Sequence, residues 1–301
     1  MTKAMLLAAV ASILVGGSVP ITGMLDGYPI LAGQAIRYGI GALALLVWLR
    51  GRLPVPGRRD LPGLIGMVGA GMLGFNALIL VAQRHATPGF VAAIIGGSPL
   101  VLAILVPALR GSRPDPRVVI GAGLVVAGVL VLTGGGSWHG PGLLLALLVL
   151  ACEVTFTLAG TGVVRRIGAV AASTWACVGA AVSAGLITTV RAEWEMPSLF
   201  QGFSLFVLGT AVTAVAFAWW YTGVSVLGAD RAGVLIGLMP LSGLGVAVIV
   251  GVQPLTITAL GGAVVVAIGC ATGLTGRRGR SRTCPPRRDP APLPAATGRR
   301  S

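Results

Sequence analysis

The chain has 301 residues, of which 55% are hydrophobic and only 10% are charged, whereas soluble domains carry about 25% charged residues. This composition excludes an ordinary soluble protein and indicates an integral membrane protein. The formal net charge of +14 does not indicate nucleic-acid binding, because the basic residues lie in short segments between hydrophobic runs rather than on one soluble domain.

Ten apolar segments are long enough to cross a bilayer, which takes about 20 helical residues. The sequence therefore predicts an all-α integral membrane protein with ten transmembrane helices. In chain order the expected spans are Ala4–Met24, Pro29–Leu49, Leu61–Ala82, Pro88–Leu109, Arg117–Thr133, Gly142–Gly162, Ala171–Val190, Gly202–Tyr221, Ala232–Val250 and Thr256–Leu274.

The basic residues fall mainly on one side of these spans. With a cytoplasmic N-terminus, nineteen of the 22 Lys and Arg residues lie in inner segments, Arg84 and Arg191 lie in outer loops, and Arg37 lies within a span. By the positive-inside rule, both termini are expected in the cytoplasm. We therefore expect a multi-pass protein of the cell membrane, meaning the inner or plasma membrane.

The second span, which contains ILAGQAIRYGIG, carries a full charge at Arg37. A guanidinium at the centre of a membrane helix costs roughly 2.5–3.5 kcal/mol, so it needs a partner or a function. The other ionisable residue well inside a span is Glu153, in the sixth helix. Both helices begin on the outer side, and the two residues lie about 12 and 16 Å from those ends, so they are able to pair.

Glu153 is expected to face the interior of the bundle. Thr157, Gly160 and Thr161 follow it at i+4, i+7 and i+8, which places all four on one helix face. An acid in a low-dielectric environment can bind a proton near physiological pH, as a proton-coupled carrier requires. The alternative is a neutral, hydrogen-bonded glutamate with a structural role only.

Arg37, Asn76 and one aromatic cluster each allow a functional and a structural interpretation. Arg37 either contacts substrate or is a buried charge that fixes its helix. For Asn76 an interhelical hydrogen bond is favoured over a substrate contact. The aromatic cluster 219–221, expected at the end of the eighth span, is interpreted as an interfacial belt. The candidate substrate or coupling residues are Arg37, Glu153, Asn76 and Thr157.

The two halves of the chain resemble each other when shifted by 141 positions. The Gly-rich turn Gly134–Gly140 lies between them. Five spans per half is an odd number, so the second half begins on the opposite side of the membrane, which makes the repeats inverted. The glycines and prolines that coincide are Gly96/Gly237, Pro99/Pro240, Gly121/Gly262 and Gly128/Gly269.

Prolines within spans four and nine are expected to bend these helices, because each removes a backbone hydrogen bond. The bends are interpreted either as hinges or cavity-lining positions, or as static packing. The candidates are Gly96, Pro99, Gly237 and Pro240.

Three units are therefore expected: a first five-helix repeat at 1–135, a second at 136–276, and a tail at 277–301. The tail holds eight arginines and five prolines in 25 residues, and almost nothing that a core would bury. It is expected to be a disordered cytoplasmic segment near anionic lipid. Three cysteines fall in spans and one in the tail, so no disulfide framework is expected.

Several segments resemble one transporter family. They are QAIRYGIGALALLVWL in span two, IIGGSPL and LIGLMPL in spans four and nine, and IGAGLVVAGVLVL with QPLTITALGGAVVVAIG in spans five and ten. This pattern is similar to the drug/metabolite transporter superfamily, specifically its two-copy EamA-type members. Members commonly carry a glutamate after helices four and nine, where this chain has Ser112 and Gln253.

The resemblance implies a secondary transporter that exports a small organic metabolite. If Arg37 and Glu153 both line the cavity, their opposite charges suit an amino-acid-like solute, and a titrating Glu153 would couple transport to protons. The alternatives are an efflux carrier for drugs or cationic compounds, and a membrane scaffold that transports nothing. No nucleotide motif, nucleophile elbow or paired metal ligands occur, so no enzyme, cofactor or metal is expected. The expected partners are the solute and the bilayer; a homodimer is left open, and no role is assigned to His85 and His139.

Overall fold

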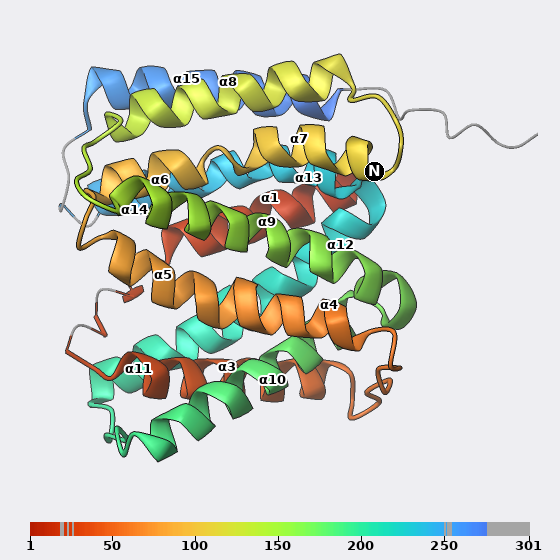
Figure 1. The fold of residues 1–301 in the computed structure, drawn as a ribbon, viewed down its shortest axis with the longest axis vertical. Coiled ribbons are helices and arrows are strands. Elements are labelled where there is room, and N and C mark those ends of the chain that lie inside the picture. The colour runs from red at the N-terminus through yellow and green to blue at the C-terminus, as the bar shows by residue number, and fades with distance from the viewer. Residues whose placement is uncertain (19–20, 23, 26, 250, 252–254, 276–301) are drawn as a thin grey trace, which may run out of the picture.

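The structure is a computed structural model that describes residues 1–18, 21–22, 24–25, 27–249, 251 and 255–275. Regular secondary structure in these residues is helical, and the helices lie side by side with their connections at two ends (Figure 1). Nine helical runs among them are long and apolar enough to cross a membrane, and α1 (Thr2–Gly17) is a shorter apolar helix. The molecule is an all-α membrane protein, as the sequence predicts.

Several spans contain more than one helical element. In chain order the elements after α1 are α3 (Ile30–Trp48), α4 (Leu61–Gly66), η1 (Met67–Gly74), α5 (Phe75–Ala82), α6 (Pro88–Ile95), α7 (Ser98–Leu109), α8 (Pro116–Thr133), α9 (Gly142–Ile167), α10 (Ala169–Val190), α11 (Leu199–Val207), η2 (Leu208–Val215), α12 (Ala216–Leu227), α13 (Ala229–Val234), η3 (Leu235–Gly237), α14 (Leu238–Ile249) and α15 (Ile257–Leu274).

The eighth span is longer than the sequence predicts, running over Leu199–Leu227. It ends where Gly228 adopts a positive φ of 91°. Thr222 and Ser225 lie within the helix, and their hydroxyls donate to backbone carbonyls of the preceding turn. Trp220 and Tyr221 are therefore buried within the last third of the span, and the prediction of an interfacial belt is wrong for them.

The third and eighth spans each contain a π-helical segment of eight residues. These segments, η1 and η2, are separated by 141 positions, the offset at which the two halves of the sequence coincide. π-Helical turns are rare in proteins and frequently occur at functional sites. Their matching position gives spans three and eight the same irregular backbone.

Spans four and nine are also interrupted at matching positions. Gly96 and Gly97 separate α6 from α7, whereas the 3₁₀ turn η3 separates α13 from α14. Pro99 lies in the first turn of α7, where a missing backbone N–H leaves no hydrogen bond unmade. The interruption in span four therefore comes before Pro99. The sequence predicts instead a continuous helix that the proline bends.

Helices at equivalent places in the two halves pack against each other. α8 packs along α15, α3 along α10, and α7 against α13. The first two pairs lie at opposite ends of the long axis of the molecule (Figure 1). Such pairing is what a pseudo-two-fold arrangement of two halves produces, while the unit boundaries at 135 and 276 stay a prediction.

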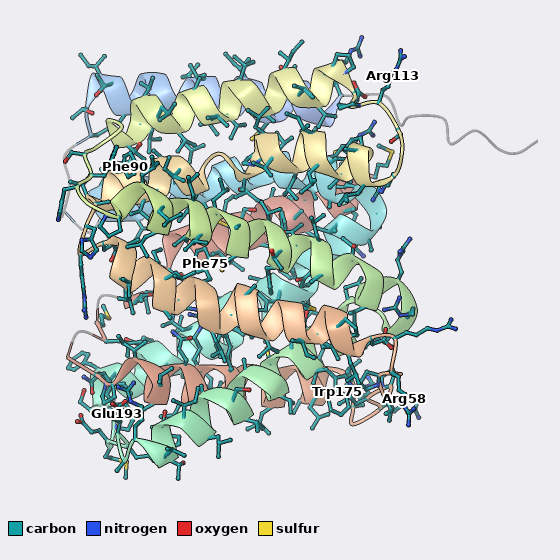
Figure 2. The ribbon with its side chains drawn as sticks, in the orientation of Figure 1. Arg58, Phe75, Phe90, Arg113, Trp175 and Glu193 are labelled. Atoms are coloured by element: carbon teal, nitrogen blue, oxygen red, sulfur yellow. The ribbon has the colours of Figure 1, made fainter. Side chains whose placement is uncertain are left out.

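The predicted inner and outer loops lie at opposite ends of the bundle. Figure 2 shows Arg58 and Arg113 at one end, and Glu193 and Phe90 at the other. The compartment that each end faces stays a prediction, and the predicted tail at 277–301 lies outside the described residues.

Candidate functional site in the membrane interior

Arg37 lies in the middle of α3 and bonds to the other half of the chain. Its Nε donates a hydrogen bond of 2.9 Å to the hydroxyl of Thr213, in η2. Its guanidinium carbon is 5.5 Å from the centroid of the Tyr38 ring. Neither Nη atom donates to another described residue, so both Nη groups are available as hydrogen-bond donors.

Tyr38, the next residue on α3, contacts the other π-helical segment. Its hydroxyl donates to the carbonyl oxygen of Met72 in η1 at 3.3 Å, and accepts from the amide of Asn76 at 3.2 Å. The Asn76 amide also donates to Met72. Asn76 therefore forms an interhelical hydrogen bond, the interpretation that the sequence favours. Arg37 and Tyr38 together connect α3 to η2 and to η1.

Glu153 is half-buried on α9, and its helix face is directed into the bundle. Thr157 is fully buried, and Gly160 lies against the ring of Tyr221, whose atoms would be 2.2 Å from a Cβ at that glycine. The Tyr221 hydroxyl donates to the carbonyl of Phe156 at 2.8 Å. Within the described part of the chain, Glu153 makes neither a hydrogen bond nor an ion pair.

The two interior charges therefore do not pair with each other, contrary to the pairing that the sequence allows. Arg37 faces η2, whereas α9 packs against η1 and α5. The buried Cys177 is within electrostatic range of Arg37 and of Tyr221, and Tyr221 is within electrostatic range of Glu153.

The interruptions in spans four and nine are packed tightly against α8. A Cβ at Gly96 would be 2.7 Å from Val129, and one at Gly237 would be 2.3 Å from Val125. Ser98 and Pro99 are buried beside the first interruption, and the Ser98 hydroxyl has no partner among the described residues, as is also true of Thr157. Packing alone accounts for the two glycines, and a hinge motion stays a prediction.

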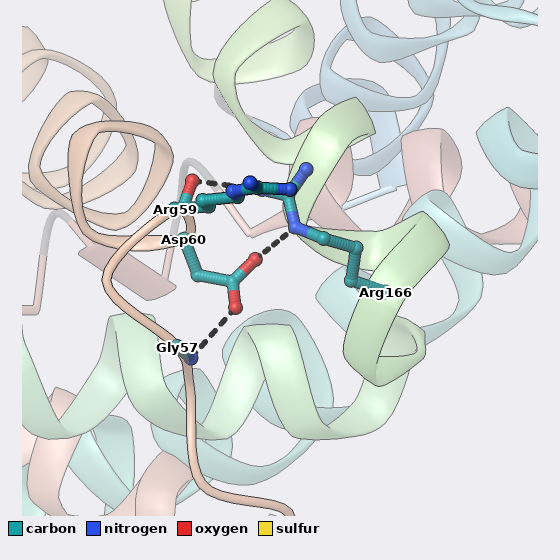
Figure 3. A network of polar contacts seen from close by, with 4 residues as sticks. All are labelled: Gly57, Arg59, Asp60 and Arg166. Atoms are coloured by element: carbon teal, nitrogen blue, oxygen red, sulfur yellow. Dashed lines mark hydrogen bonds and ion pairs between the residues drawn. The ribbon is translucent and has the colours of Figure 1, made fainter.

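Two ion pairs join the halves at the end that carries Arg58. Arg166, at the end of α9, donates to Asp60 and, at 3.0 Å, to the carbonyl of Arg59, while the Gly57 N–H donates to Asp60 (Figure 3). The hydrogen bond from Arg166, together with that from Gly57, holds the pKa of Asp60 below its ordinary value.

The second ion pair joins α13 to the start of α8. Arg231, which is only 4% exposed, lies 3.9 Å from Asp115, and Asp115 also caps α8 by accepting from the Arg117 N–H. Neither ion pair is predicted from the sequence. The position of the acids could have indicated them, because only eight acidic residues occur in the chain and two of them begin helices at the arginine-rich end.

Cavities occur at both ends of the bundle. At the arginine-rich end, a cavity of about 160 Å³ is lined by Val106, Leu109, Arg110, Leu158, Thr161 and Ala229. At the other end, a cavity of about 330 Å³ lies beside the loop between the two halves. No group of three or more His, Cys, Asp or Glu side chains that could hold a metal ion occurs among the described residues.

The fold is shared with a solved structure. A crystal structure covering 92% of this chain and 99% of its own superposes with a TM-score of 0.79 at 21% sequence identity. This similarity concerns the fold alone.

Curated relatives are named as transporters. The Bacillus subtilis protein "Uncharacterized transporter YetK" is 24% identical over 248 residues, which are 78% of this chain and 75% of that one. The Pseudomonas aeruginosa "Multidrug transporter PA4990" is 43% identical over 75 residues, which are 25% of this chain and 66% of that one. The EamA-like transporter family model matches twice, over residues 2–134 and 140–274. Together with the fold, these matches establish that the chain belongs to the EamA-like transporter family and is a membrane transporter.

Proposed function

We propose that this transporter exports a small zwitterionic metabolite of the amino-acid type, in exchange for protons. The observation that carries the proposal is the presence of two opposite charges in the membrane interior that are not paired with each other. Neither Nη group of Arg37 bonds to a described residue, and a carboxylate is the group that such a fork binds in a bidentate manner. Glu153 supplies the complementary acid on a helix of the other half.

Glu153 is proposed to alternate between a proton and the amino group of the solute. An acid without a partner in a low-dielectric interior favours its neutral form, so a proton occupies it when no cation is bound. Arrival of an ammonium group then releases that proton. This competition would couple outward movement of the solute to inward movement of a proton.

Alternating access is proposed to open the arginine-rich end by separating the two halves. The pairs Asp60–Arg166 and Asp115–Arg231 both cross between the halves there, so opening would break them. η1 and η2 supply backbone whose hydrogen-bond pattern already departs from the α-helix. Arg37 contacts η2 and Tyr38 contacts η1, so a rearrangement of either segment would change these contacts.

The test begins with the solute. Cells that overexpress the protein and cells that carry an empty vector are compared for metabolites accumulated in the medium, with membrane insertion verified. An amino-acid-like solute should be enriched in the medium of the overexpressing cells. Absence of any enriched solute would contradict export.

Flux of the enriched solute is then measured in proteoliposomes across a pH series. The wild type should show a dependence on pH with one apparent protonation, and Glu153→Gln should flatten it while facilitated flux persists. Glu193→Gln, a change at an exposed acid outside the spans, should leave the profile unaltered. A preserved pH dependence in Glu153→Gln would exclude Glu153 as the coupling residue.

Efflux of cationic drugs is the second candidate function. It is favoured by the name of the Pseudomonas aeruginosa relative and by the unpaired Glu153, since an acid without a partner attracts cations. Arg37→Gln separates the two candidates, because loss of the guanidinium should abolish zwitterion export but leave export of a cation intact. A scaffold that transports nothing would show flux of neither class.

A further inference from the structure

Two loops at the predicted outer end of the bundle are fixed to each other. The Thr87 N–H donates to the Ser137 carbonyl at 2.9 Å, the Ser137 N–H donates to the Thr87 hydroxyl at 3.0 Å, and the His139 N–H donates to the His85 carbonyl at 2.9 Å. Nearby, the rings of Phe90 and Trp138 lie 6.2 Å apart. The backbone of these two loops is therefore held in a defined arrangement.

The loops form the walls of the cavity of about 330 Å³. It is lined by Gln83, Arg84, Ala86, Thr87, Ser137 and His139, among which there is no acid. The imidazole of His85 lies beside it, with its ring centroid 5.5 Å from that of His139. The guanidinium, imidazole and amide groups and the Ser137 hydroxyl offer hydrogen-bond donors, whereas the Thr87 hydroxyl donates to the Ser137 carbonyl.

The charge at this cavity is not neutralised by the protein. Of the two arginines predicted in outer loops, Arg191 pairs with Glu193 at 3.1 Å, whereas Arg84 makes no ion pair with any described residue. Arginine is less frequent in the outer loops of membrane proteins than in the inner ones. Arg84 is exposed, so its guanidinium is accessible to an anion.

We propose that this cavity binds an oxyanion, either a carboxylate or a phosphate group, through Arg84, His139 and the neighbouring donors. A planar guanidinium binds both groups in a bidentate manner, and an imidazole and an amide complete the donor set. A cationic metal is disfavoured because Arg84 would repel it. The oxyanion belongs either to a soluble molecule or to the headgroup of an outer-leaflet lipid. The proposal does not depend on the solute that the carrier moves.

The chain contains only two histidines, and both are at this cavity, so they report on it directly. Protein without a polyhistidine tag is labelled with ring-¹³C histidine in an uncharged maltoside detergent and titrated with inorganic phosphate, and separately with acetate, at constant ionic strength. Both histidine resonances should shift and saturate. Arg84→Gln should raise the dissociation constant at least about tenfold, whereas Arg191→Gln, the matched outer arginine, should leave it unchanged.

The source of the oxyanion is distinguished by transferring the protein to lipid nanodiscs. Saturable shifts with phosphate in detergent that persist in phosphatidylcholine nanodiscs identify a soluble ligand. Shifts that occur only in phosphatidylglycerol nanodiscs, and that Arg84→Gln removes, identify a lipid headgroup. Shifts that are linear in concentration, equal in Arg84→Gln, or absent in every medium would overturn the proposal. Arg84→Lys, which keeps the charge, serves as a second variant should Arg84→Gln fail to fold.

Discussion

At the scale of single residues, Arg37 is a full charge in the membrane whose partner is a neutral hydroxyl. Burying a guanidinium at the centre of a span costs roughly 2.5–3.5 kcal/mol, while a polar contact between membrane helices contributes about 0.6–1.7 kcal/mol. The bond to Thr213 and the contact with the Tyr38 ring therefore offset only part of the cost. The remaining donors favour a solute-binding role for Arg37.

Removing the hydroxyl of Thr213 should destabilise the folded protein. Thr213→Val leaves the Arg37 guanidinium without its acceptor, and we expect a loss of about 1–2 kcal/mol, whereas Thr213→Ser keeps the acceptor and most of the stability. Thermal unfolding in detergent measures both variants. A loss for Thr213→Ser that equals or exceeds the loss for Thr213→Val would contradict a stabilising role of the hydroxyl as the main contribution of Thr213.

Sequence reasoning identified the residues of this site but not the contacts between them. Arg37 and Glu153 stand out because charges are rare in apolar spans. Thr213 does not, because a threonine in a membrane helix is common and this one lies 176 positions from Arg37. Which two side chains meet depends on helix packing, which hydropathy does not encode.

At the scale of helices, α8 and α15 approach each other through glycine. A Cβ at Gly121 would lie 2.4 Å from the backbone nitrogen of Gly273, and one at Gly128 would lie 2.7 Å from that of Val266. Small residues allow such close contact between membrane helices, where dispersion forces replace the hydrophobic effect. The two helices are thereby fixed as one rigid pair at an end of the long axis (Figure 1).

Gly128→Ala should disrupt this helix pair, because the added methyl group would meet backbone atoms of α15. We expect a destabilisation of about 1–3 kcal/mol, measured as a lower unfolding temperature and a lower folded yield. Gly123→Ala is the matched control on the same helix, since nothing lies within 4 Å of a Cβ there. Similar losses at both glycines would show that helix propensity or expression, and not the close contact, is responsible.

The spans were predictable and their internal irregularities were not. Apolar length locates a span because the bilayer sets a minimum, but it carries no information on whether a turn has α, π or 3₁₀ hydrogen bonding. For this reason η1 and η2 were not expected. An apolar length of about 20 residues ends the eighth span at Tyr221, whereas in the structure the helix continues to Leu227 and ends at Gly228.

At the scale of the whole molecule, two halves are held together at the arginine-rich end by ion pairs. Asp60 is buried and Arg166 is partly exposed, whereas both side chains of the pair Arg191–Glu193 are more exposed. Exposed pairs contribute little to stability, so the pair at Asp60 is the more important of the two. It connects the start of span three to the end of span six.

The contribution of Asp60 should depend on pH in a defined direction. Because its pKa is lower in the folded protein, its stabilisation is present above the ordinary aspartate pKa of 3.8 and is lost as pH falls below that value, through the folded pKa. Asp60→Asn should therefore unfold at a lower temperature than wild type at pH 7, and the difference should shrink below about pH 4.

Thermal unfolding from pH 7 to pH 3 measures this, with Glu193→Gln as the control that should change little. A difference between Asp60→Asn and wild type that stays constant over this range would contradict a charged role for Asp60.

The polar contacts of Arg37 and Tyr38 in the first half have no counterpart in the described part of the second half. At the positions 141 residues later, α10 carries Val178 and Gly179, which have no side-chain donor. When an inverted-repeat carrier exchanges the conformations of its halves, its two end states are related by the pseudo-two-fold axis only as far as the side chains match. Here the polar bridge exists on one side alone. The carrier without solute should therefore rest mainly in one orientation rather than divide its time equally between the two faces of the membrane.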